Sequence, residues 1–168
     1  MSHVQHNSGN NEWYTPKFIL DAARNTLGYF DIDPASNDIA QEMVQAKVFY
    51  TVDNSGLDKE WNGKVWMNPP YSGPLIKQFC NKLKDEVDAG NTSEFITLTN
   101  NATETLWFKT LFELSNAFCF IHKRLKFLDC LGQHGNSPLQ GQVLCYRGTS
   151  MDKFKEQFGK YGLIMVKD

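Results

Sequence analysis

Apolar positions along the chain change repeatedly between a strand-like and a helix-like pattern. Short, largely apolar runs at Lys64–Met67, Phe95–Thr99 and Ala117–Ile121 are typical of buried strands. Between them, Pro74–Glu86 and Thr103–Leu114 repeat apolar residues three and four positions apart, as amphipathic helices do. Strands that alternate with helices form parallel βαβ units. We therefore expect an α/β fold with a mostly parallel sheet and helices on both of its faces.

Weaker patterns extend this arrangement toward both ends of the chain. Pro16 fits the first turn of a helix that ends at Gly28. The other expected elements are short strands at Tyr29–Ile32, Val48–Val52, Gln142–Tyr146 and Leu163–Val166, and helices at Ile39–Ala46 and Met151–Phe158. Residues 1–11 are polar and predict a flexible tail, so residues 12–168 would form one domain.

Composition narrows the possible classes of protein. The chain has 168 residues, of which 41% are hydrophobic and 21% charged, as in an ordinary globular domain. No apolar run reaches the roughly 20 residues that span a bilayer, so we expect no membrane association. A net charge of −2 excludes nucleic-acid binding by bulk charge alone, although a local basic patch is compatible with it. The cysteines and histidines lack metal-ligand spacing, so we expect no metal, free thiols and a reducing, cytoplasmic environment.

The tetrapeptide Asn68-Pro69-Pro70-Tyr71 follows the strand at Lys64–Met67 and precedes a helix. Its prolines lack N–H donors, so the stretch presents acceptors, namely the Asn68 side-chain oxygen and backbone carbonyls. Acceptors of this kind suit an exocyclic NH₂ group, and Tyr71 offers a flat face on which a base can stack. A base in a duplex must be flipped out to reach such a site. The alternative is a structural loop in which Asn68 caps the helix and Tyr71 packs, but the position after a strand favours the functional interpretation.

A second polar stretch, residues 31–36, lies at the end of the strand expected at Tyr29–Ile32, at the same edge of the expected sheet. A carboxylate from Asp31 or Asp33 could there accept hydrogen bonds from ribose hydroxyls, or face a sulfonium or an amino group. Asp33-Pro34 is also a common way to begin a turn, so turn chemistry is the alternative.

The chain resembles the Dam-like DNA N6-adenine methyltransferases of phages and prophages. Four stretches carry the resemblance: Glu12-Trp13-Tyr14-Thr15-Pro16, Asp31-Ile32-Asp33-Pro34-Ala35-Ser36, Trp66-Met67-Asn68-Pro69-Pro70-Tyr71-Ser72, and Arg124-Leu125-Lys126-Phe127 with Ser137-Pro138. The resemblance implies a compact Rossmann-like, S-adenosylmethionine-dependent methyltransferase fold. It also implies methyl transfer to adenine N6 in DNA by a site-specific enzyme, acting in the host cytoplasm if the chain is phage-encoded.

The resemblance also assigns roles to residues. The catalytic loop would be Asn68, Pro69, Pro70 and Tyr71. The residues expected to contact S-adenosylmethionine are Tyr14, Thr15, Pro16, Asp31, Asp33, Pro34, Ala35, Ser36 and Asn68. The chain departs from the broader class of methyltransferases because Asn37 and Asp38 stand where a glycine-rich loop usually follows the first strand. Asp53 and Asp58 are the candidates for a ribose contact.

Only about thirty residues separate Asp33-Pro34 from Asn68, too few for an additional target-recognition module. The module must therefore follow Tyr71, and the irregular segment at about residues 122–140 is the expected DNA-recognition segment. It contains the densest basic cluster of the chain, beginning at His122. The residues expected to bind double-stranded DNA are Lys123, Arg124, Lys126 and Ser137. The alternative for this cluster is a solvated strand edge.

Two other functions remain compatible with these residues. The NH₂ acceptor could be RNA adenine, cytosine N4 or a protein glutamine instead of DNA adenine. Alternatively, the chain could be a non-catalytic relative that binds DNA or the cofactor, which the missing glycine-rich loop would explain. The intact Asn68–Tyr71 loop favours an active enzyme.

Overall fold

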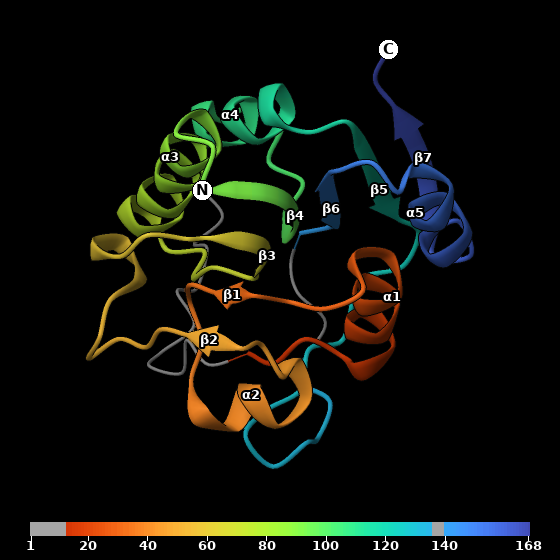
Figure 1. Cartoon of the computed structure of the whole chain (residues 1–168). Helices are drawn as coiled ribbons and strands as arrows, with labels where there is room; N and C mark the ends of the chain where they lie inside the picture. The colour runs from red at the N-terminus through yellow and green to blue at the C-terminus, as the bar shows by residue number, and fades with distance from the viewer. Residues whose placement is uncertain (1–12, 136–139) are drawn as a thin grey trace, which may run out of the picture.

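The computed structural model describes residues 13–135 and 140–168, which form a seven-stranded sheet with helices on both faces (Figure 1). The expected tail at residues 1–11 and the expected DNA contact Ser137 lie outside the described residues. The strands are β1 (Ile32–Asp33), β2 (Val48–Phe49), β3 (Gly63–Met67), β4 (Thr92–Asn100), β5 (Ala117–Ile121), β6 (Gln142–Arg147) and β7 (Gly162–Val166). The helices are α1 (Lys17–Leu27), α2 (Asp38–Val44), α3 (Gly73–Asp88), α4 (Leu106–Leu114) and α5 (Met151–Phe158), with a short 3₁₀ turn η1 (Gly56–Asp58).

The directions of the strands place most of their carboxyl ends at one edge of the sheet. The strand order is β2-β1-β3-β4-β6-β5-β7, and β2, β1, β3 and β4 are parallel to one another. β6 is antiparallel to both β4 and β5, so β5 runs in the same direction as β4, and β7 runs opposite to β5. The prediction of a mostly parallel α/β sheet is therefore confirmed, and β1 to β5 all end at the same edge.

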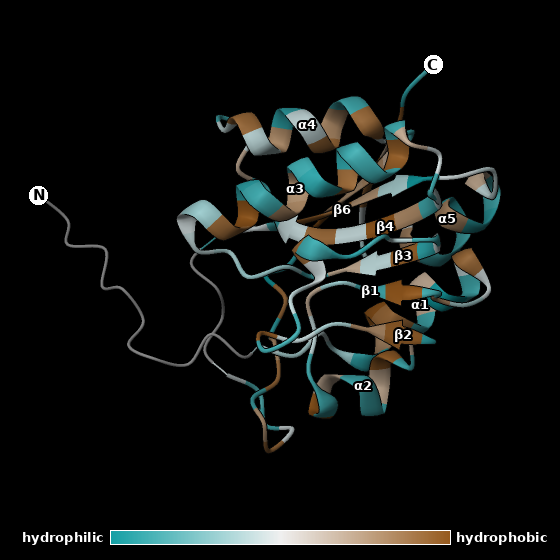
Figure 2. Cartoon of the chain, turned by 60° about the vertical axis from the view of Figure 1, so that its left-hand side comes forward, coloured by the Kyte–Doolittle hydropathy of each residue, from teal (hydrophilic) through white to brown (hydrophobic). Residues whose placement is uncertain are grey.

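Two hydrophobic cores lie on the two faces of the sheet because side chains alternate along each strand. Trp66 of β3 and Ile96 of β4 face the core that α1 and α5 complete. Their neighbours Val65 and Phe95 face the second core, which α3 and α4 complete. Figure 2 shows α3 and α4 on one side of the sheet and α1 and α2 on the other. No helix in the described ranges is long and apolar enough to cross a membrane.

Element types agree with the sequence pattern, whereas several boundaries differ from it. The strand expected at Val48–Val52 ends at Phe49, and the one expected at Tyr29–Ile32 begins only at Ile32 and extends to Asp33. The helix expected to begin at Thr103 begins after Thr105, whose hydroxyl accepts a hydrogen bond from the Phe108 N–H at 3.3 Å. The start of this helix is set by the Thr105 side chain, which caps a backbone N–H group of the first turn. The apolar periodicity does not reveal the position of such a cap.

Asp31 joins the beginnings of three parallel strands. Its Oδ2 accepts a hydrogen bond from the Lys64 N–H at 2.9 Å, and its Oδ1 lies 2.8 Å from the Lys47 ammonium group. Gly63 has a φ of +101° and would place a Cβ 2.3 Å from Asp31 Oδ2. A residue with a side chain at position 63 is therefore both strained and in conflict with this carboxylate.

We predict that Gly63→Ala destabilises the protein more than Gly90→Ala. Both glycines have positive φ, so both substitutions should cost about 1–2 kcal/mol of unfolding free energy. Gly90 has no heavy atom within 4 Å of an added Cβ, whereas Gly63→Ala must also displace Asp31, which should cost about 1–3 kcal/mol more. Urea denaturation of the two variants measures the difference, and equal losses would show that the Asp31 contact does not constrain the fold.

Candidate active site

Polar side chains gather where β1 and β3 end. Asp33 is the last residue of β1, and Asn68 directly follows β3. Ile32 pairs with Val65, so Ala35 and Asn68 each follow a paired residue by three positions. Because neighbouring strands lie about 4.8 Å apart, this register puts the turn at residues 33–36 beside the Asn68 loop. We call residues 33–36 the strand-end turn.

A segment from the start of the domain crosses over both strand ends. We call residues 14–16, just before α1, the crossing segment. The Asn68 Nδ2 group donates to Thr15 Oγ1 at 3.1 Å, and the Asn37 Nδ2 group donates to the Tyr14 hydroxyl at 3.2 Å. Tyr14, Thr15 and Pro16 are all buried. The structure thus brings together three of the stretches that the sequence singled out, although they are far apart along the chain.

Tyr71 is turned inward in this structure. Its hydroxyl lies 3.0 Å from Asn68 Oδ1 and 3.2 Å from the Leu98 carbonyl oxygen, and it donates toward both acceptors. Its ring packs against the core on the α3 and α4 side, and burial raises the pKa of Tyr71. The Asn68 oxygen expected to accept a hydrogen bond from an amine therefore has Tyr71 as its donor here.

The strand-end turn is held by a residue that the sequence analysis did not select. Gln41 Nε2 donates to Asp33 Oδ2 at 2.9 Å and to Ser36 Oγ at 2.8 Å, while its Oε1 accepts from the Ala46 N–H at 2.9 Å. Asp33 is 2% exposed, and this burial raises the pKa of its carboxyl to about 7 despite hydrogen bonds from Ser36, Ala35 and Gln41 that lower it. Asn37 and Gln41 lie about one helical turn apart in the sequence, and this spacing was the signal that both side chains lie on the same side of the helix that follows the strand-end turn.

The 3₁₀ turn η1 also supports the strand-end turn, whereas Asp31 lies at the opposite ends of the strands. A Cβ on Gly56 would lie 2.3 Å from the Pro34 carbonyl oxygen, so η1 packs directly against the turn. Asp31 precedes β1, and its carboxylate contacts the beginnings of β2 and β3. The structure does not bring it to the edge where Asn68 lies. Asp53 and Asp58, the candidates for a ribose contact, are both exposed.

The basic segment, residues 122–126, continues from β5 at the same edge of the sheet. His122, Lys123, Arg124 and Lys126 are exposed, whereas Leu125 is buried in the core on the α1 side. Exposed and buried residues alternate from Arg124 to Phe127, as in an extended chain that Leu125 and Phe127 anchor to the core, with the cations toward solvent.

The same chain then pairs with the crossing segment. Tyr14 and Leu128 exchange two backbone hydrogen bonds of 2.9 Å, and Leu128 also forms an isolated bridge with His134. A Cβ on Gly135 would lie 2.1 Å from the ring of Trp13. The expected recognition segment, as far as it is described, is therefore packed onto the residues that position Thr15.

Comparison with known proteins gives one family match that covers nearly the whole chain. Residues 2–162 match the family model described as DNA N-6-adenine-methyltransferase (Dam). Over 98 residues the chain is 30% identical to the DNA N-6-adenine-methyltransferase of Escherichia phage T1, covering 57% of this chain and 38% of that protein. Over 65 residues it is 34% identical to the DNA N-6-adenine-methyltransferase of Haemophilus phage HP1, covering 38% of this chain and 36% of that protein.

A further similarity is to a protein with another description. The chain is 26% identical over 113 residues to inactive phospholipase C-like protein 1 of Homo sapiens, which covers 64% of this chain and 10% of that protein. The matched region spans less than two fifths of the length of each phage relative.

We predict that Asp33→Asn flattens the pH dependence of stability between about pH 4 and pH 7. The folded state retains the proton up to a pKa of about 7, whereas the unfolded chain releases it near 3.8. The folded state thus binds more protons in this window, and the free energy of unfolding falls as the pH rises, by at most about 1.4 kcal/mol per pH unit. Above pH 7 this contribution is constant. Urea denaturation at several pH values measures it, with the exposed Asp85→Asn as control, and parallel profiles for wild type and Asp33→Asn would contradict the prediction.

Proposed function

Because this chain belongs to the DNA N-6-adenine-methyltransferase (Dam) family, we propose that it transfers a methyl group to the N6 amine of adenine in DNA. The observation that carries the proposal is that the crossing segment meets Asn68 and Asn37 at one edge of the sheet, where the register of β1 and β3 also puts the strand-end turn beside Asn68. The seven-stranded α/β arrangement agrees with the compact methyltransferase fold expected for such an enzyme.

S-adenosylmethionine is the proposed methyl donor, and the polar groups at this edge fit its methionine end. The cofactor supplies a methyl group activated on a sulfonium. A positive charge next to the strand-end turn favours the ionised form of Asp33, whose carboxyl has a pKa of about 7. The proposed contacts are Tyr14, Thr15, Pro16, Asp33, Pro34, Ala35, Ser36 and Asn68. We leave Asp31 out of the site because its carboxylate serves the other ends of the strands.

The Asn68–Tyr71 loop is proposed to hold a flipped adenine. Asn68 Oδ1 and the Pro69 carbonyl oxygen accept the two N–H groups of the N6 amine, which directs the nitrogen lone pair toward the methyl group. Tyr71 must then leave Asn68 Oδ1 and turn its ring onto the base. After transfer the amine releases a proton to water, so no general base has to act before the attack. Catalysis is then mainly positioning and local electrostatics.

Double-stranded DNA is the proposed substrate. If the chain is phage-encoded, the proposed enzyme acts on this DNA in the host cytoplasm. The basic segment is exposed and ends at the crossing segment, which connects it to Thr15 and Asn68. Lys123, Arg124 and Lys126, together with Ser137, are the proposed phosphate and base-edge contacts within a recognition segment at about residues 122–140.

We predict that Asn68→Ala lowers the rate of DNA methylation by about 10² to 10³. The substitution removes the acceptor that orients the amine, while the half-buried loop position should cost little packing. Sequencing of DNA from expressing cells, by a method that detects methylated adenine, tests the activity and reads the target site. Transfer of labelled methyl groups by the purified protein measures the rate.

Asn68→Asp is the matched control because a carboxylate has the same size and also accepts hydrogen bonds, so it should retain part of the activity. Thermal unfolding must show that both variants are folded. A wild-type rate in Asn68→Ala would show that the Asn68–Tyr71 loop is not the catalytic site.

We predict that the double variant Arg124→Ala/Lys126→Ala weakens DNA binding and leaves the affinity for S-adenosylmethionine unchanged. The removed charges lie on the exposed side of the basic segment, where they can meet phosphates. DNA affinity is measured at two salt concentrations, and cofactor affinity by calorimetry. If the folded double variant binds DNA with the affinity of the wild type, the basic segment does not contact DNA and is a solvated strand edge.

A further inference from the structure

A cavity of about 570 Å³ lies beneath the basic segment. Its walls come from the start of α1, the chain after β5, and the turn between α5 and β7. Cavities of about 300–1,000 Å³ are typical of sites for small molecules and single building blocks of polymers. Two of its lining residues, Lys160 and Tyr161, belong to no motif and are brought here by the fold alone.

The charge of the cavity differs from that of the chain. Lys123, Arg124, Lys126 and Lys160 all line it, and no acidic residue does among the described residues. The whole chain, in contrast, has 19 acidic residues and a net charge of −2. A concentration of cations in an otherwise weakly acidic protein favours a polyanion such as a nucleic-acid backbone.

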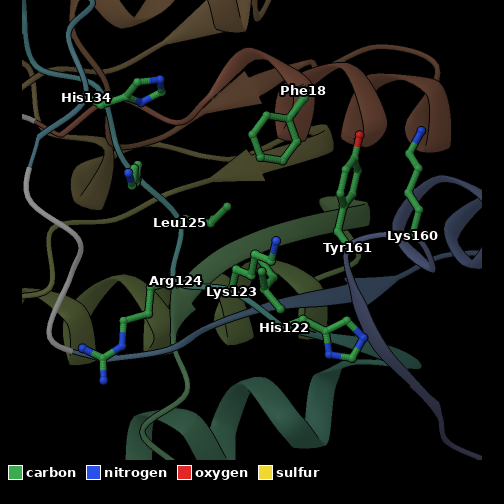
Figure 3. Close-up of a pocket in the computed structure, with 10 residues that line it drawn as sticks. Phe18, His122, Lys123, Arg124, Leu125, His134, Lys160 and Tyr161 are labelled. Carbon is green, nitrogen blue, oxygen red and sulfur yellow. The ribbon is translucent and has the colours of Figure 1, made fainter.

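Aromatic rings accompany these cations. Phe18 is 44% exposed although it is one of the large apolar residues of α1, and its ring centre lies 5.0 Å from that of Tyr161 at 51°. Lys160 Nζ lies 5.1 Å from the centre of the Tyr161 ring. Figure 3 shows Phe18 and Tyr161 side by side with Lys160 next to them, while Arg124 turns away. Phe18 is thus exposed and Tyr161 half-buried. Accessible aromatic rings among cations are the features that bind unstacked bases together with their phosphates.

The cavity is close to the proposed active site and separate from it. Phe18 follows Thr15 by three residues, and Thr15 bonds to Asn68. β5, which leads into the cavity, is three strand positions from β3 in the sheet, a distance of about 14 Å. At about 3.4 Å per nucleotide along a strand, this corresponds to about four nucleotides from the base at Asn68.

We propose that this cavity is a second nucleotide subsite, which takes one nucleotide of the bound DNA a few positions from the target adenine. Its phosphate lies against Lys123, Lys126 and Lys160, and its base, which must leave the duplex stack as the target adenine does, lies against Phe18 and Tyr161. This inference rests on the proposed function, because it assumes that DNA is the substrate. It adds α1 and the turn before β7 to the DNA-binding surface, which the basic cluster alone did not include.

The test measures binding by fluorescence anisotropy, with a labelled single strand of about 16 nucleotides and with its duplex. Lys160→Ala should weaken binding and lower the salt slope, between about 50 and 200 mM salt, by nearly one unit. Phe18→Ala should weaken binding to the single strand by about fivefold to a hundredfold and leave the salt slope unchanged, because stacking is not an ionic contact. Phe18→Leu removes the ring but keeps an apolar side chain, so the packing of the protein should stay as in the wild type. It should lose as much affinity for the single strand as Phe18→Ala does.

Lys153→Ala is the matched control, since Lys153 is exposed on α5 and does not line the cavity. Binding by Phe18→Leu and Lys160→Ala equal to that of Lys153→Ala would overturn the subsite. If the wild type methylates DNA but the cavity variants bind like the control, the subsite fails and the proposed function stands. If no DNA is methylated but the cavity variants lose DNA binding selectively, the subsite stands and the proposed reaction fails.

Discussion

The paired backbones of Tyr14 and Leu128 hold together the two parts of the molecule that the proposed function requires. Their two hydrogen bonds join the crossing segment to the chain that follows β5. The same few residues then contact Asn37, which directly follows the strand-end turn, through the Tyr14 hydroxyl, and the Asn68 loop through Thr15. One short stretch thus contacts groups from three separate places along the chain, so a change in its path would alter all of them together.

The strand-end turn is ordered by side chains instead of glycines. Gln41 uses both of its amide N–H groups on Asp33 and Ser36 and its oxygen on Ala46, and Asn37 accepts from the Ala40 N–H at 2.8 Å to cap α2. A buried carboxyl at the end of a strand is costly unless it is hydrogen-bonded, and Gln41 supplies that bond. The absence of a glycine-rich loop therefore does not by itself indicate a loss of the site, which weakens the argument for a non-catalytic relative.

The sequence predicted the parts of the fold and site that depend on local patterns. The alternation of strands and helices from β3 to β5 and the place of Asn68 after a strand follow from periodicity and proline chemistry. Asp31 shows where such reasoning ends, because its position next to Asp33 suggested a shared role. Its actual partners, Lys47 and Lys64, are 16 and 33 residues away and are set by strand pairing. Lys160 and Tyr161 were missed for the same reason: only the antiparallel return of β7 brings them to the edge where β5 ends.

The inward position of Tyr71 has a consequence for the choice of base. Its hydroxyl donates toward Asn68 Oδ1, so in the proposed mechanism an arriving base would enter by exchange, replacing one donor with another. A base that carries an NH₂ group restores the bond that Tyr71 gives up. A base with only a carbonyl at that position leaves the Asn68 oxygen without a donor, at a cost of about 1–3 kcal/mol. In the proposed mechanism the displaced hydrogen bond of Tyr71 would therefore select for a base with an NH₂ group before methyl transfer.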